Sequence, residues 1–145
     1  MGRAVAVVTG SNKGIGFAIV KALCSKFEGN VILTARDEER GKAAVEKLKA
    51  EGLNPEFHLL DISDENSIKT LASFLKNEYG GLDVLVNNAA IAYKMADPAP
   101  FSEQAEKTVQ VNFFDTLNVC HHLFPLLRPH ARVVNVSSSA GSCYI

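Results

Sequence analysis

A glycine-rich run near the amino terminus has the residue types and the spacing to bind a phosphate group. Residues 9–16 read TGSNKGIG and lie between an apolar run and a helical pattern. Glycines there let the backbone turn tightly and approach a pyrophosphate, whose negative charge is favoured at the amino terminus of a helix. The spacing TGxxxGxG differs from the commoner GxGxxG, and a purely structural turn is the alternative. The position between a buried strand and an amphipathic helix favours dinucleotide binding.

Two cations indicate which dinucleotide. Arg36 follows Ala35 at the end of a second strand-like run, and Lys13 lies within the glycine run. An acidic residue in place of Arg36 would hold the ribose 2′-hydroxyl of NAD, whereas arginine suits the 2′-phosphate of NADP. A charge pair about 4 Å apart near a surface interacts by roughly 4 kcal/mol before desolvation is subtracted. The alternative is that Arg36 is a solvated loop charge, but the two cations together predict NADP(H) as the cofactor.

Polar side chains follow three further strand-like runs. Asp61 could accept a hydrogen bond from the adenine amino group, or it could be a turn or cap residue. Asn87 and Asn88 follow the fourth run, where one amide could pin neighbouring backbone and the other could lie beside the nicotinamide ribose. Residues 137–139 are serines, which taken alone form a small-residue loop. Asn112 interrupts a long helical pattern, and a break there would expose a carbonyl oxygen.

These residues need elements that bring them to one edge of a sheet. Short apolar runs predict strands at residues 4–9, 31–34, 57–60, 84–86 and 133–136. Helical patterns cover residues 14–27, 37–51, 63–80 and 102–127, the last broken near Asn112. Five parallel strands with right-handed crossovers predict one Rossmann-type α/β domain over residues 1–145, a doubly wound sheet in the order 3-2-1-4-5. Such a sheet normally continues past strand five, so we expect a domain truncated there, with strand five as an edge.

Periodicity also predicts which helix faces pack on the sheet. The first helix is expected to turn one apolar face inward, made of Ile15, Ala18, Ile19, Ala22 and Leu23. The second is expected to begin at an Asp37 cap, to bury Ala44, Val45 and Leu48, and to end at Gly52.

Composition excludes several classes of protein. The chain has 145 residues, a formal net charge of -1 and 47% hydrophobic residues, which suits one globular domain without a basic footprint for nucleic acid. No apolar run approaches the roughly 20 residues of a membrane helix, and no signal peptide is recognised. Three cysteines without metal spacing, Cys24, Cys120 and Cys143, predict reduced thiols and a cytoplasmic location. We therefore expect a protein that binds neither nucleic acid nor membranes.

The order of the motifs is typical of one enzyme family. After TGSNKGIG come LDI at 60–62, NNA at 87–89, VNFF at 111–114 and VNVSS at 134–138. Over its whole length the chain therefore resembles the short-chain dehydrogenases/reductases. The stretches LTARD at 33–37 and EYGGLDVLVNN at 78–88 closely resemble the NADPH-dependent carbonyl reductases of vertebrates, which are monomeric and cytosolic.

This resemblance implies hydride transfer from NADPH to a small-molecule carbonyl: a ketone, an aldehyde or a quinone. It implies two catalytic residues: Ser138, which would hydrogen-bond the substrate carbonyl and opens a Ser-x-x-Gly ending at Gly141, and Asn112, which would support a proton relay through water. The cofactor-binding residues are then expected to be Gly10, Ser11, Asn12, Lys13, Gly14, Ile15, Gly16, Arg36, Asp61, Ile62, Asn88, Ala89 and Ala90. No metal site is expected.

The sequence departs from the family where the general acid should follow. In the family, a tyrosine protonates the carbonyl oxygen, and a lysine four residues later lowers the pKa of that tyrosine. Tyr144 has only Ile145 after it, and Tyr79 and Tyr93 lie in other segments without the lysine spacing. We therefore expect this chain to be inactive alone. The alternative function is a nucleotide-binding or interaction protein that uses the strand-five edge.

Two smaller departures fall at tight places. Ala90 stands where the family usually has glycine beside the cofactor, and Asp115 replaces the usual glycine after Asn112. A weaker alternative is another Rossmann module such as an NAD-linked epimerase, against which Arg36 and Lys13 argue.

Overall fold

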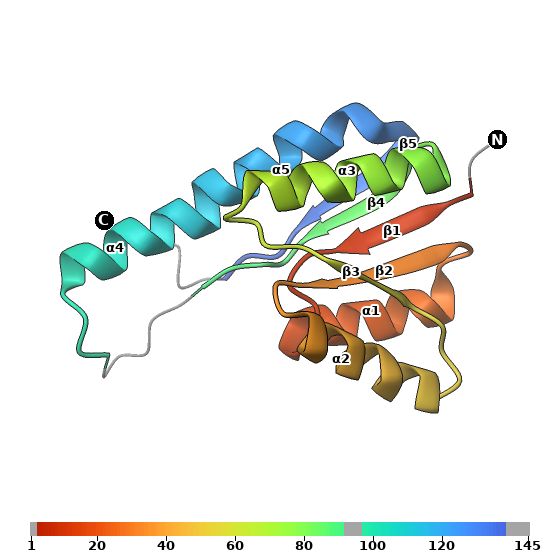
Figure 1. Cartoon of the computed structure of the whole chain (residues 1–145), viewed down its shortest axis with the longest axis horizontal. Helices are drawn as coiled ribbons and strands as arrows, with labels where there is room; N and C mark the ends of the chain where they lie inside the picture. The colour runs from red at the N-terminus through yellow and green to blue at the C-terminus, as the bar shows by residue number, and fades with distance from the viewer. Residues whose placement is uncertain (1–2, 92–96, 139–145) are drawn as a thin grey trace.

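Five parallel strands form one sheet in the order β3-β2-β1-β4-β5, as predicted (Figure 1). The computed structural model describes residues 3–91 and 97–138. The strands are β1 (Val5–Val8), β2 (Asn30–Ala35), β3 (Glu56–Leu59), β4 (Leu82–Asn87) and β5 (Leu127–Asn135). The strands at the centre are continuous apolar runs because helices cover both of their faces. Their carboxyl ends therefore meet at one edge, where the predicted site residues follow.

Two helical layers enclose the sheet. On one face lie α1 (Gly14–Lys26) and α2 (Glu38–Ala50), and on the other lie α3 (Glu65–Tyr79) and α5 (Thr116–Leu123), as Figure 1 shows. One apolar core forms under each layer, around Val20 and Leu48 in the first and around Leu71 and Leu123 in the second. No helix within residues 3–91 and 97–138 has the length and apolar character to cross a membrane.

The long helical pattern at 102–127 is broken as predicted. It consists of α4 (Phe101–Val109), the π-helix η1 (Gln110–Asp115), α5 and the 3₁₀-helix η2 (Phe124–Leu126). Asn112 lies inside the π-helix. Pro125 lies in η2, where its missing N–H ends the regular helix before β5.

Local signals at the helix ends are also confirmed. The Asp37 carboxylate accepts a hydrogen bond from the Arg40 N–H (2.9 Å) at the start of α2, and Gly52 follows that helix with a φ of 82°. Helix α3 begins at an Asp64 cap, one residue after the predicted Ser63, and ends at Gly80 with a φ of 75°. Positive φ favours glycine, which has no Cβ to clash.

The predicted inward face of α1 is confirmed for Ile19 and Leu23, which pack against the core, and was wrong for its other three residues. Gly16 and Val20 are buried, whereas Ala18 and Ala22 are exposed and Ile15 is 64% exposed. A Cβ on Gly16 would lie 2.6 Å from the Gly10 carbonyl oxygen, so the bare glycine lets α1 approach the turn after β1. That tertiary contact and the apolar residues Ile19, Val20 and Leu23 together set the rotation of the helix.

The predicted start of β5 was also wrong, because the strand begins at Leu127 and not at 133. Leu82 pairs with Leu127 and Val84 with Arg132, so β5 bulges between these two pairs. The bulge contains Pro129, which cannot donate a ladder hydrogen bond, and His130 with a φ of 67°. As predicted, β5 is an edge strand, and Val133 and Val134 are 37% and 47% exposed.

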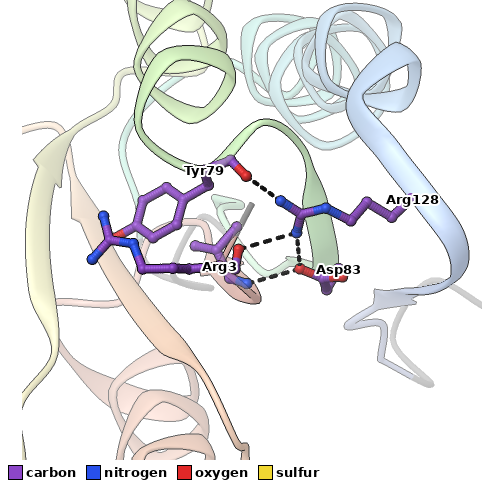
Figure 2. Close-up of polar contacts among 5 residues, drawn as sticks. Arg3, Tyr79, Asp83 and Arg128 are labelled. Atoms are coloured by element: carbon purple, nitrogen blue, oxygen red, sulfur yellow. Dashed lines mark hydrogen bonds and ion pairs between the residues drawn. The ribbon is translucent and has the colours of Figure 1, made fainter. Parts of the chain in front are cut away.

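A side-chain cluster joins the amino ends of β1, β4 and β5, opposite the site edge. The Arg128 guanidinium forms an ion pair with Asp83 and donates hydrogen bonds to the Tyr79 and Arg3 carbonyl oxygens (Figure 2). Asp83 also accepts from the Val5 N–H at 2.8 Å. The Arg3 guanidinium lies 4.8 Å from the centroid of the Tyr79 ring. We call Arg128, Asp83 and the main-chain carbonyl groups of Tyr79 and Arg3 the Arg128 clamp.

Candidate functional site

The glycine turn lies between the carboxyl end of β1 and the start of α1. Gly10 and Gly14 have φ values of 57° and 62°, a conformation that glycine adopts without strain. A Cβ on Gly10 would lie 2.8 Å from the Ala89 Cα, so this glycine lets the segment after β4 pack against the turn. Apart from its chain neighbours and the backbone of α1, no heavy atom of the described residues lies within 4 Å of the Cβ position of Gly14, so the turn is open on that side.

Thr9 and Asn88 hold the turn from the β4 side. The Thr9 hydroxyl oxygen accepts hydrogen bonds from the N–H groups of Asn88 and Ala89, each at 2.9 Å. The Asn88 side-chain amide donates to the Gly10 carbonyl oxygen, also at 2.9 Å. Asn88 is therefore the amide that pins neighbouring backbone. The sequence places Thr9 at the start of the glycine-rich motif, but its role in binding the segment after β4 was not predicted.

Asn87 points to the other side of the sheet edge. The side-chain amide nitrogen of Asn87 donates to the Asn135 side-chain oxygen at 2.9 Å. The buried side-chain oxygen of Asn87 has no hydrogen-bond partner in residues 3–91 and 97–138. The Val136 N–H donates to the Asn87 carbonyl oxygen of the main chain at 3.0 Å, which carries the β4–β5 pairing toward Ser138. Asn87 thus ties the end of β5 to the site edge.

Ser11 is a structural part of the turn. Its buried hydroxyl donates to the Val8 and Thr34 carbonyl oxygens (2.9 and 3.3 Å) and accepts from the Thr34 N–H (3.0 Å). The Ser11 N–H donates to the Thr34 carbonyl oxygen as well, at 2.8 Å. Because these polar groups bind β1 and β2, Ser11 fixes the position of the turn against the sheet.

The amino terminus of α1 differs from those of α2 and α3. It has no side-chain cap and no acidic residue in its first turn, whereas α2 and α3 each begin with a capping aspartate and acidic residues. Lys13 directly precedes α1, and Arg36 follows β2, two residues past Thr34, which binds Ser11 of the turn. Both side chains are exposed, and neither forms an ion pair within the described parts of the chain. Asn12 is half-buried in the same turn. The local electrostatics favour an anion.

Asp61 forms a turn at the end of β3. Its carboxylate accepts hydrogen bonds from the Ser63 N–H (3.0 Å) and from the Ser63 hydroxyl (2.6 Å). The Ser67 hydroxyl accepts the Asp61 N–H at 2.9 Å. Ile62 is 8% exposed and belongs to the core under α3. The turn role of Asp61 is therefore observed, and its contact with adenine stays a prediction.

Asn112 joins the π-helix to the segment after β4. Its side-chain oxygen accepts a hydrogen bond from the Ile91 N–H (2.8 Å), and its amide donates to the Ile91 carbonyl oxygen (2.9 Å). Sequence reasoning missed Ile91, which has no polar side chain to mark it. Because both ends of the Asn112 amide are bound, the side chain fixes the backbone beside Ala89 and Ala90.

Ser138 is exposed and lies three residues past the end of β5, at the carboxyl edge of the sheet. Ala90 is exposed at the same edge, after β4. Gly141, Tyr93, Tyr144 and Cys143 fall outside the described residues. The structure thus brings Ser138 to the edge that carries the glycine turn and Asn88.

Tyr79 lies at the opposite end of the sheet, near the amino ends of β1, β4 and β5. It is not suited to donate a proton to a substrate. Its hydroxyl donates to the Glu56 carboxylate at 2.8 Å. Burial, and then this hydrogen bond, raise the pKa of Tyr79 to about 12. Burial also raises the pKa of the Cys24 and Cys120 thiols, so these cysteines are poor nucleophiles.

Comparisons with known proteins agree with this geometry. The family model described as short chain dehydrogenase matches residues 4–144. Carbonyl reductase [NADPH] 3 of Mus musculus is 64% identical over 137 residues, which are 94% of this chain and 50% of that protein. Carbonyl reductase [NADPH] 1 of Homo sapiens is 64% identical over 134 residues, 92% of this chain and 48% of that protein. The chain spans about half the length of these relatives.

A solved structure agrees with the fold as well. Salutaridine reductase from Papaver somniferum superposes with a TM-score of 0.86 and 38% sequence identity. The match covers 97% of this chain and 59% of that one.

Proposed function

This chain belongs to the short-chain dehydrogenase family, and on that premise we propose that it binds NADP(H) as the nucleotide-binding part of a carbonyl reductase. The single observation that carries this proposal is the open glycine turn at an α1 terminus that has neither a cap nor an acidic first turn. The 64% identity to proteins named carbonyl reductase [NADPH] supports the same cofactor and a small-molecule carbonyl substrate.

The glycine turn fits a pyrophosphate. Gly14 leaves space above the turn, and the α1 N–H groups supply a positive end for the phosphates. Arg36 and Lys13 would hold the 2′-phosphate, since both are exposed cations: Lys13 directly precedes α1, and Arg36 follows the end of β2 that binds Ser11 of the turn. Asn88, which holds Gly10 in place, would act on the cofactor through the shape of the turn. Asp61, Ile62, Ala89 and Ala90 complete the proposed lining.

The reaction would take place at the same edge of the sheet. Bound NADPH supplies the hydride in this family's chemistry. Ser138 would donate a hydrogen bond to the substrate carbonyl oxygen. Asn112 would support the proton relay through its main-chain carbonyl, because its side-chain amide already binds Ile91 at both ends.

We propose that the chain alone does not turn over substrate. The proton donor of the family is a tyrosine with a lysine four residues later, and the sequence contains no such pair. Tyr79 points away from the site edge and has a raised pKa. A cytoplasmic location and a monomeric state stay predictions.

A direct test measures binding and turnover separately. NADPH and NADH are titrated into the chain while nicotinamide fluorescence is recorded, and we expect NADPH to bind at least tenfold more tightly. Arg36→Ala combined with Lys13→Ala should remove most of that preference, with Lys47→Ala as a control because the exposed Lys47 lies in the last turn of α2. NADPH oxidation with a quinone should stay at background. Equal affinity for the two nucleotides would contradict the cofactor assignment.

The alternative function is an interaction protein, and the open edge of β5 favours it. Val133 and Val134 are partly exposed on this strand, and no strand within residues 3–91 and 97–138 pairs with its outer edge. Stable co-purification of this chain with a whole carbonyl reductase would support that function. A monodisperse monomer that binds NADPH and retains no reductase would contradict it.

A further inference from the structure

The two end residues of the π-helix are joined by their side chains. The Gln110 amide donates a hydrogen bond to the Asp115 carboxylate at 3.0 Å, across five residues. Asp115 is 9% exposed, and its other carboxylate oxygen is buried without a partner in the parts of the chain that the structure describes. An unpartnered buried oxygen lowers the free energy of unfolding. The stability of the fold therefore does not explain why an aspartate occupies this position.

The spacing of this hydrogen bond selects a π-helix over an α-helix. In an α-helix, side chains three and four residues apart face each other. A π-helix has main-chain bonds across five residues, which brings residues five apart onto one side. The Thr116 hydroxyl donates to the Val111 carbonyl oxygen at 3.3 Å, and this bond also spans five residues. Both side-chain bonds therefore fit the π form of the segment.

The π form decides where Asn112 points. Helix α5 is fixed in the core by Val119 and Leu123, so a change of winding in η1 moves the residues before it. Rewinding to an α-helix shifts the register by about one residue, which rotates Asn112 by roughly 100°. The Asn112 amide would then no longer reach the two Ile91 main-chain groups that it binds at 2.8 and 2.9 Å.

We propose that Gln110 and Asp115 are positioning residues, whose hydrogen bond holds the π-helix that presents Asn112 to Ile91. The value of this arrangement for carbonyl reduction rests on the proposed function, in which Asn112 supports the proton relay. The link from the Gln110–Asp115 pair to the Asn112–Ile91 contact does not depend on that function. The two can therefore be tested apart.

The test follows amide hydrogen exchange at Ile91 by NMR on the full chain, without nucleotide. The Ile91 N–H donates to Asn112, so losing that contact exposes it to exchange. We expect Gln110→Ala and Asp115→Ala each to speed Ile91 exchange at least fivefold. Exchange at Leu123, in the core, should change less than twofold. Gln110 is exposed, which makes its variant the one least liable to unfold.

A swapped pair supplies the readout that a merely structural role would not give. Gln110→Asp combined with Asp115→Gln reverses donor and acceptor and should return Ile91 exchange to within twofold of the parent. Gln104→Ala is the matched control, because the Gln104 amide bonds the Ala99 carbonyl oxygen outside the π-helix at 2.7 Å. Unchanged Ile91 exchange in Gln110→Ala, or no recovery in the swapped pair, would overturn the proposal. Failure to bind NADPH would contradict only the proposed function.

Discussion

Replacing Arg128 with methionine tests whether the Arg128 clamp holds β5 in the sheet. Methionine keeps an unbranched side chain of similar length and removes the charge together with all the donors. Three contacts are lost: the ion pair with Asp83 and the hydrogen bonds to the carbonyl oxygens of Tyr79 and Arg3. Asp83 keeps only its bond from the Val5 N–H among the described contacts. We therefore expect a loss of stability concentrated at the amino ends of three strands.

The size of the expected loss of stability depends on how exposed the Arg128–Asp83 ion pair is. Hydrogen bonds to a charged group contribute about 1.5–3 kcal/mol each, and breaking a buried ion pair costs about 3–5 kcal/mol. The Arg128 and Asp83 side chains are 22% and 25% exposed, so water compensates part of the loss, and the Val5 N–H compensates more. We expect the free energy of unfolding to fall by about 2.5 kcal/mol. With a urea m-value of about 1.5 kcal/mol/M, the midpoint falls by roughly 1.7 M.

Urea unfolding followed by circular dichroism measures this midpoint. Arg132→Met is the matched control, because the exposed Arg132 lies in the same strand and its side chain bonds, among the described residues, only the nearby His130 and Ala131 carbonyl oxygens. The control should lose less than about 0.5 kcal/mol, as surface substitutions do. Arg128→Lys should lose more than half as much as Arg128→Met, because an ammonium group cannot span the same three acceptors. Equal midpoints for Arg128→Met and Arg132→Met would refute the reasoning.

Three further substitutions test the glycine turn and the Tyr79 contact. Gly16→Ala places a Cβ 2.5 Å from the Asn88 amide nitrogen, so we expect a loss of about 1–3 kcal/mol in urea unfolding and weaker NADPH binding. In Gly14→Ala the new Cβ meets no atom of the described residues within 4 Å outside α1 and the chain neighbours, but the residue has a φ of 62°. Backbone strain alone should therefore lower the free energy of unfolding by about 1 kcal/mol. A larger loss of stability than for Gly16→Ala would contradict the packing argument. Folding raises the pKa of Tyr79 from 10.0 to about 12, so the stability this residue contributes is complete below pH 10 and is lost as the pH rises toward 12. Tyr79→Phe should flatten the dependence of the melting temperature on pH in that window, and an unchanged slope would show that folding does not raise the pKa of Tyr79.

The order of the sheet and the ends of the helices could be predicted because their signals are local. Asp37 and Gly80 each act within one helical turn, and apolar runs separated by helices leave few topologies. The rotation of α1 could not be predicted in the same way. It depends on Gly16 meeting Gly10 and Asn88, which are close only in the folded chain.

The sequence indicated which polar residues lie near the candidate site, but not which groups they contact. Asn88, Asn112 and Asp61 were singled out because amides and carboxylates at strand ends and helix breaks are conspicuous, and their contacts with cofactor and substrate stay predictions. Their partners were not, because Ile91 contributes only main-chain groups and Gln110 pairs with Asp115 across a spacing that the α-helical period does not contain. Asp115 was noticed as a departure from a family pattern, but only the structure shows that it faces inward.

The Arg128 clamp also bears on how the chain is made. Arg128 reaches Arg3 across 125 positions of sequence, and strand β4 has one open edge until β5 is available to pair with it. At about 5–20 residues per second, a ribosome needs roughly 2 to 10 s to synthesise the stretch from Asn87 to Asn135. Throughout that interval the unfinished sheet can accept a strand from another nascent chain. Synthesis on crowded polysomes is therefore a stage at which β4, an inner strand of the finished sheet, is open to misassembly, and chaperone capture of the β4 edge would protect it there.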